Sequence, residues 1–586
     1  MHKHHRGQNR FWQVVGLSAA MGAMLSSGAP SPAYACGGLF CNAPPPDPFA
    51  PLPIAQTGEN IVFSVTKTAG VVTGVEAHIQ IFYSGPASKF SWIVPVDALP
   101  TIGVGSDRMF TSVAAVTQPT FTTDWVTEGT CKVNSMGDPR NAGAPGPSAG
   151  SGGSAGGIIG DSGVNVAFRG VVGPFDAAVI KSSSNAELVK WLKDNGYFVA
   201  DSAVAIIDQY VSENKYFVAL KLLNGKDVQA IQPVVLKFAG SEPCVPIRLT
   251  AIAAQKDLSI NLWVLGTART VPKNYFEIKL NDARIDWLNG SNNYSDLVKQ
   301  AANEAGGNAF IAEYAGASSV MKGQLWPNGA INLARLRLEV TPPPYLKMVV
   351  SQGLTMFAQT LSLLRQHIPL PKRLADMGVS ESEFYNNNQF YWDNYRADFA
   401  PFDANKLTDD IDTAVVTPLR EGQATFDAQP YLTRLATFLS PEEMGTDPIF
   451  IFNDELPTVS NVHKATAHVL CGDQRYSYCE APVRVEVEGG QTLFFKRDPK
   501  LPCGGAFQRG DVDKTPALGI AYQREEVGEG VKKIDNTAAI ASALSAHNAV
   551  ASGTDGCGCS LGGGPMAASA AAALMLTLAL LRRSRR

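Results

Sequence analysis

Apolar and polar residues alternate along most of the first half of the chain. The alternation is clearest in residues 60–85, around a turn that contains glycine, while residues 89–100 form an apolar run that ends in proline. Because successive side chains of a strand point to opposite faces of a sheet, this period of two predicts β-strands. The same signal returns in residues 164–180, 215–223, 231–240 and 244–254.

Helix signals interrupt this pattern twice. Ser184 and Glu187 have the spacing of a capping box, and Gly196 stands where the helix would end. A second helix is expected to end at the glycine pair 306–307. The aromatic residues of these two helices are interpreted as packing residues, and nothing independent supports a ligand-stacking role for them: Trp191 and Tyr294.

The chain changes character after the prolines at 342–344. Residues 348–367 carry leucine and phenylalanine side chains at helical spacing, which predicts a helical middle segment. Strand signals resume in residues 464–471 and 483–496. From about Thr515 to Thr554 the apolar periodicity is lost, which is typical of a linker or stalk.

These signals predict an α+β protein. We expect β-rich mixed sheets with packed helices in the N-terminal half, a helical middle segment, a smaller β-containing C-terminal region and a single C-terminal transmembrane helix. A Gly/Ser-rich stretch at 138–161 is expected to be a flexible surface insertion. The predicted order is a signal peptide (1–35), a Pro-rich leader (36–55), a β-rich α+β domain (56–345), a helical segment with a small β region (346–514), a linker or stalk (515–556) and a sorting tail (557–586) with its transmembrane helix at 563–581.

The N-terminal residues have the features of an export signal. Basic residues precede an apolar run at 11–29 that is too short and too rich in Ala and Gly for a stable anchor. Ala33 and Ala35 occupy the small-residue positions that a signal peptidase reads, so we expect cleavage that leaves Cys36 as the first mature residue. The alternative is a lipid-modified Cys36, for which Ala33 stands where Leu is usual. Both alternatives imply export.

The C-terminal residues have the features of a membrane anchor. An uncharged run of about 20 residues starts at Gly562, and a helix of that length spans roughly 30 Å, the thickness of a bilayer's hydrocarbon core. A basic stop would hold the chain end on the cytoplasmic side and leave the body outside. The alternative, a buried Ala/Leu helix, is disfavoured by the basic stop and the preceding stalk. The residues of the stop are Arg582, Arg583, Arg585 and Arg586.

Nine cysteines in an exported chain are read as disulfide candidates. Proximity alone favours two small loops, one between Cys36 and Cys41 and one between Cys471 and Cys479. A zinc site is the competing interpretation, but the paired C-x2-C spacing of zinc ligands is absent. The sequence therefore predicts no metal and no other cofactor.

Charge and motifs exclude more functions than they suggest. A net charge of −4 implies no basic face, so nucleic acid is not expected as a partner. Two G-x-S-x-G matches lie within 146–156, but neither has the strand and helix that a nucleophile elbow needs. Asp403, Asn405 and Asp409 resemble part of a calcium loop without its glycine and closing glutamate, so a solvated turn is preferred. The histidines show no catalytic spacing, and no catalytic residue is assigned.

Two resemblances add to these predictions. The order "GCGCS", glycines, apolar helix and "RRSRR" resembles the MYXO-CTERM sorting signal, which implies processing near Cys557 and Cys559 by a sorting protease, followed by surface attachment. The segments "GENIVFSV", "IQIFYSGPASKFSWIVPV", "ELVKWLKDNGY" and "YLTRLATFLSPEEMGTDPIF" resemble the DUF2330 family of exported bacterial proteins, whose function is unknown. We therefore expect a surface-anchored envelope protein, structural or binding; the alternative is an exported hydrolase that acts on envelope polymers or peptides.

Overall fold

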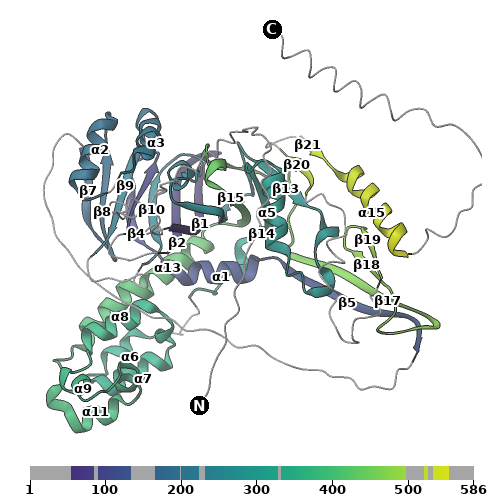
Figure 1. The fold of residues 1–586 in the computed structure, drawn as a ribbon. Helices are drawn as coiled ribbons and strands as arrows, with labels where there is room; N and C mark the ends of the chain where they lie inside the picture. The colour runs from purple at the N-terminus through teal and green to yellow at the C-terminus, as the bar shows by residue number, and fades with distance from the viewer. Residues whose placement is uncertain are drawn as a thin grey trace, which may run out of the picture.

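The computed structural model of the chain describes residues 55–84, 90–132, 165–197, 199–223, 231–326, 331–496, 520–524 and 532–552. Its fold is mixed α+β, with several sheets and a helical middle segment, as the sequence predicts (Figure 1). The helical segment extends away from the sheets on one side, and a long pair of strands extends on the other.

A mixed sheet of ten described strands forms the centre of the molecule. Its order is β21-β20-β13-β14-β15-β11-β1-β2-β10-β4, and the pairs β1–β11 and β13–β14 are parallel while the other pairs are antiparallel. The strands are β1 (Ala55–Thr68), β2 (Val71–Ser84), β4 (Thr101–Val104), β10 (Val234–Ala239), β11 (Ala254–Gly266), β13 (Phe276–Leu280), β14 (Ala309–Ala317), β15 (Tyr431–Leu439), β20 (Ile520–Arg524) and β21 (Lys532–Asp535).

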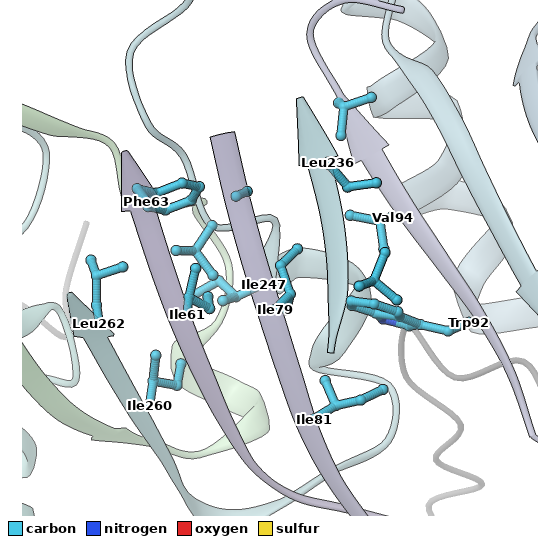
Figure 2. Packing of buried hydrophobic residues seen from close by; sticks show 14 of the residues in the cluster. Ile61, Phe63, Ile79, Ile81, Trp92, Val94, Leu236, Ile247, Ile260 and Leu262 are labelled. Atoms are coloured by element: carbon cyan, nitrogen blue, oxygen red, sulfur yellow. The ribbon is translucent and has the colours of Figure 1, made fainter. Parts of the chain in front are cut away.

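A second, antiparallel sheet packs against the β1–β2–β10 part of the central sheet. Its inward side chains, such as Trp92 and Val94, contact Ile79 and Leu236 in the largest buried apolar cluster (Figure 2). Two helices cover its outer face, α2 (Asn185–Asp194) and α3 (Asp201–Ser212). The strand order is β3 (Ser91–Val96), β9 (Tyr216–Leu222), β8 (Phe175–Lys181) and β7 (Asn165–Val172), and the short α4 (Ile247–Thr250) lies beside the same core.

A third sheet joins strands from distant parts of the chain. Strand β5 (Thr120–Lys132) pairs in parallel with β17 (Val462–Ser477), and the order is β19-β18-β17-β5. Together with α5 it covers the β13–β14 end of the central sheet, and the C-terminal helix α15 lies along β19. The remaining elements here are β18 (Val483–Val487), β19 (Thr492–Phe495), α5 (Tyr294–Glu304), α15 (Thr537–Ser552) and a two-stranded sheet of β12 (Arg269–Pro272) and β16 (Phe450–Asn453).

Helices α1 (Asp107–Thr117) and α13 (Thr417–Asp427) pack on the face of the central sheet opposite the second sheet. A π-helical turn at Asp412–Val416 links α13 to the helical middle segment, which has an apolar core of its own. The helices of that segment are α6 (Leu333–Arg337), α7 (Pro342–Ser351), α8 (Ala358–His367), α9 (Lys372–Asp376), α10 (Glu381–Asn386), α11 (Asn388–Tyr395) and α12 (Ala404–Ile411).

The helix signals in the first half are confirmed. Ser184 is the N-cap of α2 and accepts a hydrogen bond from the backbone N–H of Glu187, while Gly196 ends the helix with φ at +79°. The helix expected over 348–367 is instead two helices, because Gly353 adopts a φ of +70° between them. A residue in this left-handed conformation cannot continue a right-handed helix, so the helix ends there and a second one begins after it. The apolar residues keep their helical spacing within each of the two helices.

Two features of the structure lie at the predicted boundaries. The predicted break near residue 345 does not divide the central sheet, since β15 lies between β14 and β11. Proline-rich turns mark where the chain bends and carry no information on which strands pair later. Part of the expected stalk is also packed: β20 pairs with β13, and Asn548 of α15 donates to the carbonyl of Thr492 at 2.6 Å. Short strands and an Ala-rich helix leave too weak a period to detect.

The predicted disulfide between Cys471 and Cys479 is wrong. Cys471 is bonded to Cys131, 340 positions away, and Cys479 is in a disulfide of its own. The reason is that β17 continues through Cys471 to Ser477, so the chain between the two cysteines is largely strand rather than a closed loop. The parallel pairing of β17 with β5 brings Cys131 alongside instead.

Several predictions lie outside the described residues. These are the export signal with Ala33, Ala35 and Cys36, the Cys36–Cys41 pair, the insertion at 138–161, the tail cysteines Cys557 and Cys559, the span at 563–581 and the terminal arginines. Within the ranges that the structure describes, no helix has the length and apolarity needed to cross a membrane.

Candidate functional site

A pocket of about 320 Å³ lies where the central sheet meets the third sheet. Strands β13 and β14 and residues 457–460 contribute to its lining. The backbone of Val459 is held there by two 2.9 Å hydrogen bonds with Ala315. We call this the ionic pocket, after the polar side chains that line it: Arg269, Glu277, Lys279, Asp282, Tyr294, Glu313 and His463.

Glu313 is the most enclosed acid of the ionic pocket, with 5% of its surface exposed. The register of β14 against β15 shifts between Ala312 and Tyr314, so a β-bulge sets the position of Glu313. Its carboxylate lies 2.6 Å from Arg434 Nε and accepts a 2.9 Å hydrogen bond from the hydroxyl of Tyr294. Burial and the neighbouring carboxylate raise the pKa of Tyr294 well above its usual range. The phenol therefore acts as a hydrogen-bond donor here.

A second buried ion pair also lines the pocket. Arg269, of which 6% is exposed, pairs through Nη2 with Glu277 and donates from Nη1 to the carbonyl of Pro457 at 2.8 Å. It thereby ties the segment at 457–460 to strand β13. Among the described residues, the buried Nε of Arg269 has no hydrogen-bond partner. A buried donor of this kind is uncommon, because leaving it unpaired costs about 1–3 kcal/mol.

Asp282 and His463 also line the pocket. Burial raises the pKa of Asp282, and the charges of His463 and Lys279 act in the other direction. The imidazole of His463 stacks on the ring of Phe121, its register neighbour in β5, with ring centroids 4.9 Å apart. The third sheet therefore fixes the position of the histidine relative to the acid.

The chemistry of this arrangement favours binding. Within each of the two arginine–glutamate pairs, the positive and negative charges cancel. The hydroxyl of Ser460 accepts a hydrogen bond from the backbone N–H of Val462 at 3.1 Å. No group of three or more His, Cys, Asp or Glu suited to a metal occurs in the part of the chain that the structure describes. The pocket thus offers hydrogen-bonding groups of both kinds and little net charge.

Much of this geometry lies in a segment with recognisable relatives. A model of a family of uncharacterized proteins conserved in bacteria, DUF2330, matches residues 75–448, more than half of the chain. The chain belongs to the DUF2330 family. The DUF2330 segment contains Arg269, Glu277, Glu313 and Arg434, while the lining residues between 457 and 463 lie beyond it. No curated protein and no solved structure matches the chain.

The other histidines that the sequence offers lie away from the ionic pocket. His78 is buried and lies 2.7 Å from Glu76, which also accepts from Thr425. Although burial opposes it, hydrogen bonding and charge from His78 lower the pKa of Glu76 to about 2. His367 pairs with Asp410 at 2.8 Å in the helical segment. Neither pair has a serine or cysteine in a described hydrogen bond with its histidine.

The remaining candidates have structural roles. Trp191 is buried and stacks on Tyr197, as expected of a packing residue. The carboxylate of Asp403 accepts hydrogen bonds from two backbone N–H groups and caps α12, while Asp409 pairs with Arg337 at 2.7 Å. Tyr294, interpreted from sequence as a packing residue, instead lines the ionic pocket.

No sequence pattern identified the charged residues that build the ionic pocket. A usable signal was present, because Glu313 and Arg434 are each the single charged residue of a largely buried strand. A charged side chain in a buried strand needs a partner of opposite charge. One acidic and one basic residue in two such strands therefore predict an ion pair between them. The order of the strands, which the sequence does not show, is what makes them neighbours.

Proposed function

We propose that this protein is an exported envelope protein, held at the cell surface by its C-terminal tail, that binds a small polar ligand in the ionic pocket. Export rests on Ala33, Ala35 and Cys36, and anchoring rests on Cys557 and Cys559 ahead of the apolar run. Its expected processing partners are a signal peptidase and a sorting protease. The membrane is its expected attachment.

One observation carries the binding proposal. The ionic pocket is lined by buried charged groups that already have partners, while Arg269 Nε, Asp282 and His463 keep capacity for a ligand. A donor that is unpaired and nine-tenths buried favours a ligand with an acceptor oxygen, and Asp282 favours a donor beside it. The ligand class that fits is a small polar molecule that carries both kinds of group and little net charge.

Thermal shift with defined probes tests this proposal. We expect zwitterionic or neutral probes, such as glycine, serine, glucose and N-acetylglucosamine, to include at least one that raises the melting temperature of the full chain. Asp282→Asn and His463→Gln should abolish that shift. Asp296→Asn, at an exposed position of α5, is the matched control and should keep it. A shift that survives both pocket substitutions would contradict the assignment of this pocket.

The anchoring part has a separate test. With Cys557 and Cys559 replaced by serine, we expect the chain to keep its unprocessed mass and to be lost from the cell surface on fractionation. If the variant instead has the same mature mass and surface display as the unmodified chain, the sorting role of these cysteines is contradicted. That result would not bear on the pocket.

A hydrolase that acts on envelope polymers or peptides is the second candidate, because Ser460, His463 and Asp282 line the same pocket. Cys244 is a weaker candidate nucleophile: it is free, but burial and then the charge of Asp447 raise the pKa of its thiol, which disfavours the reactive thiolate. Turnover of p-nitrophenyl acetate or a casein substrate that Ser460→Ala abolishes would favour hydrolysis over binding.

A further inference from the structure

A second, larger cavity of about 700 Å³ lies between the two sheets and the helical segment. Strands β2, β3, β8 and β10 supply one side, and residues 355–361 supply the other. Its wall is mostly apolar and includes four aromatic side chains, those of Phe82, Phe90, Trp92 and Phe175. The volume is in the range of small-molecule sites, roughly 300–1,000 Å³.

Asp107 is the single ionisable side chain among the described residues that line this cavity. It is the first residue of α1, and its carboxylate accepts hydrogen bonds from the side-chain amides of Gln80 and Gln359. In the described ranges, no lysine, arginine or histidine pairs with it. The adjacent Arg108 donates to the sulfur of Met356 instead, at 3.3 Å.

A row of side-chain amides across three strands points at Asp107. Asn261 of β11 donates to Asn60 of β1 at 3.1 Å, Asn60 donates to Gln80 of β2 at 3.0 Å, and Gln80 donates to Asp107 at 2.7 Å. Because each donor faces the next acceptor in the same direction, the amides polarise one another toward the carboxylate. The start of α1 adds a positive dipole end. The side chains around Asp107 that the structure describes therefore hold its carboxylate in place and provide no positively charged partner for it.

We propose that this cavity binds an organic cation with an apolar body, its ammonium group placed against Asp107 and its body among the aromatic rings. An aromatic face attracts a cation, and a carboxylate without a counter-ion at an apolar wall gains most from a cationic ligand. An anionic ligand would be repelled, and a neutral one would leave the charge of Asp107 without a counter-ion. The site is separate from the ionic pocket and does not depend on its function.

Calorimetric titration of the full chain tests the proposal with three probes of one shape. These are 2-phenylethylammonium, the neutral 2-phenylethanol and the anionic 3-phenylpropionate, all at pH 7. We expect the ammonium to bind about tenfold tighter than the alcohol, and the anion not to bind. Equal affinity for ammonium and alcohol would overturn the proposal.

Substitutions separate this site from non-specific binding. Asp107→Asn keeps a partner for the glutamine amides and should bring the affinity for the ammonium down to that of the alcohol. Leu361→Lys adds a cation at a half-exposed position of the lining and should weaken ammonium binding at least tenfold. Leu338→Lys, at an exposed position outside the lining, is the matched control and should bind as the unmodified chain does. If Asp107→Asn does not fold, Leu361→Lys decides: ammonium binding that it leaves unchanged would overturn the proposal.

Discussion

Cys131 of β5 and Cys471 of β17 are joined by a disulfide that spans 340 positions of the chain. The bond lies within the third sheet, and Cys471 belongs to the apolar core beneath that sheet. It therefore adds a covalent link between two strands that also meet through backbone hydrogen bonds, packing and the contact of His468 with Glu128 at 2.9 Å.

Removing this bond should lower stability markedly. Cross-links that close long loops stabilise by about 3–5 kcal/mol, mostly by restricting the unfolded chain. We expect Cys131→Ala with Cys471→Ala to lower the free energy of unfolding in urea by that amount. Cys244→Ala is the control, since Cys244 is a free cysteine, and it should change stability much less. Equal effects in the two variants would contradict the assigned role of the bond.

The buried pair of Glu313 and Arg434 predicts an asymmetric mutational result. Glu313→Gln leaves a buried guanidinium without a counter-charge, so we expect a loss of about 3–5 kcal/mol. Replacing both residues, with Glu313→Leu and Arg434→Met, should recover most of that loss. Urea unfolding measures both. A double variant less stable than Glu313→Gln would show that the pair contributes more than its desolvation costs, and would contradict the expected asymmetry.

Glu59 predicts a stability that falls as the pH rises. Burial raises its pKa to about 7, against an opposing hydrogen bond from Gln56. The folded state therefore holds a proton that the unfolded state releases above about pH 4.5, so this contribution is full below pH 4.5 and is lost by about pH 7. We expect the change that Glu59→Gln makes in the free energy of unfolding to be about 3 kcal/mol more favourable at pH 8 than at pH 4.

Glu76 should show the opposite dependence and serves as the comparison. Its pKa is lowered to about 2, so its contribution is present above about pH 4.5 and is lost as the pH falls toward 2. Glu76→Gln should therefore flatten the acid side of the stability profile while Glu59→Gln flattens the neutral side. Thermal unfolding between pH 2 and 8 measures both, and a neutral-side slope that survives Glu59→Gln would contradict its assignment.

Gly353 predicts a local backbone effect. Its φ of +70° favours glycine, and the nearest atom to an added Cβ is the terminal methyl of Met356 at 3.6 Å. Gly353→Ala should therefore cost about 1 kcal/mol through conformation rather than through a clash. Gly422→Ala, in the interior of α13, is a useful contrast because its cost would come from contact with Leu325 at 3.3 Å.

The sequence predicted local structure well where one signal acts alone. Ser184 and Gly196 bound α2 because a cap and an αL residue are local features. Pairing over long distances was not predictable in the same way: nothing near Cys471 indicates Cys131, and nothing near Tyr431 indicates that β15 lies beside β11. These relations are set by how whole sheets pack, which a single sequence does not contain.

The candidate site likewise combines features that the sequence shows with features that depend on long-range pairing. His463 and Tyr294 were visible as residue types, but their common pocket depends on β5 pairing with β17 and on α5 crossing β14. Glu313 and Arg434 become meaningful only as a pair on neighbouring strands. The sequence therefore shows which polar residues the chain contains, but it does not show that these residues form one site.

The place of β15 has a consequence for the order in which the molecule can be completed. Synthesis runs from the N terminus, so β1, β2, β10, β11, β13 and β14 all exist before residue 431 is made. Until then β11 and β14 each have an open edge where β15 will later insert, and open edges invite pairing with other chains. The chain must therefore survive the synthesis of more than a hundred residues between β14 and β15 with its central sheet in two pieces, and the helical segment is made during that interval.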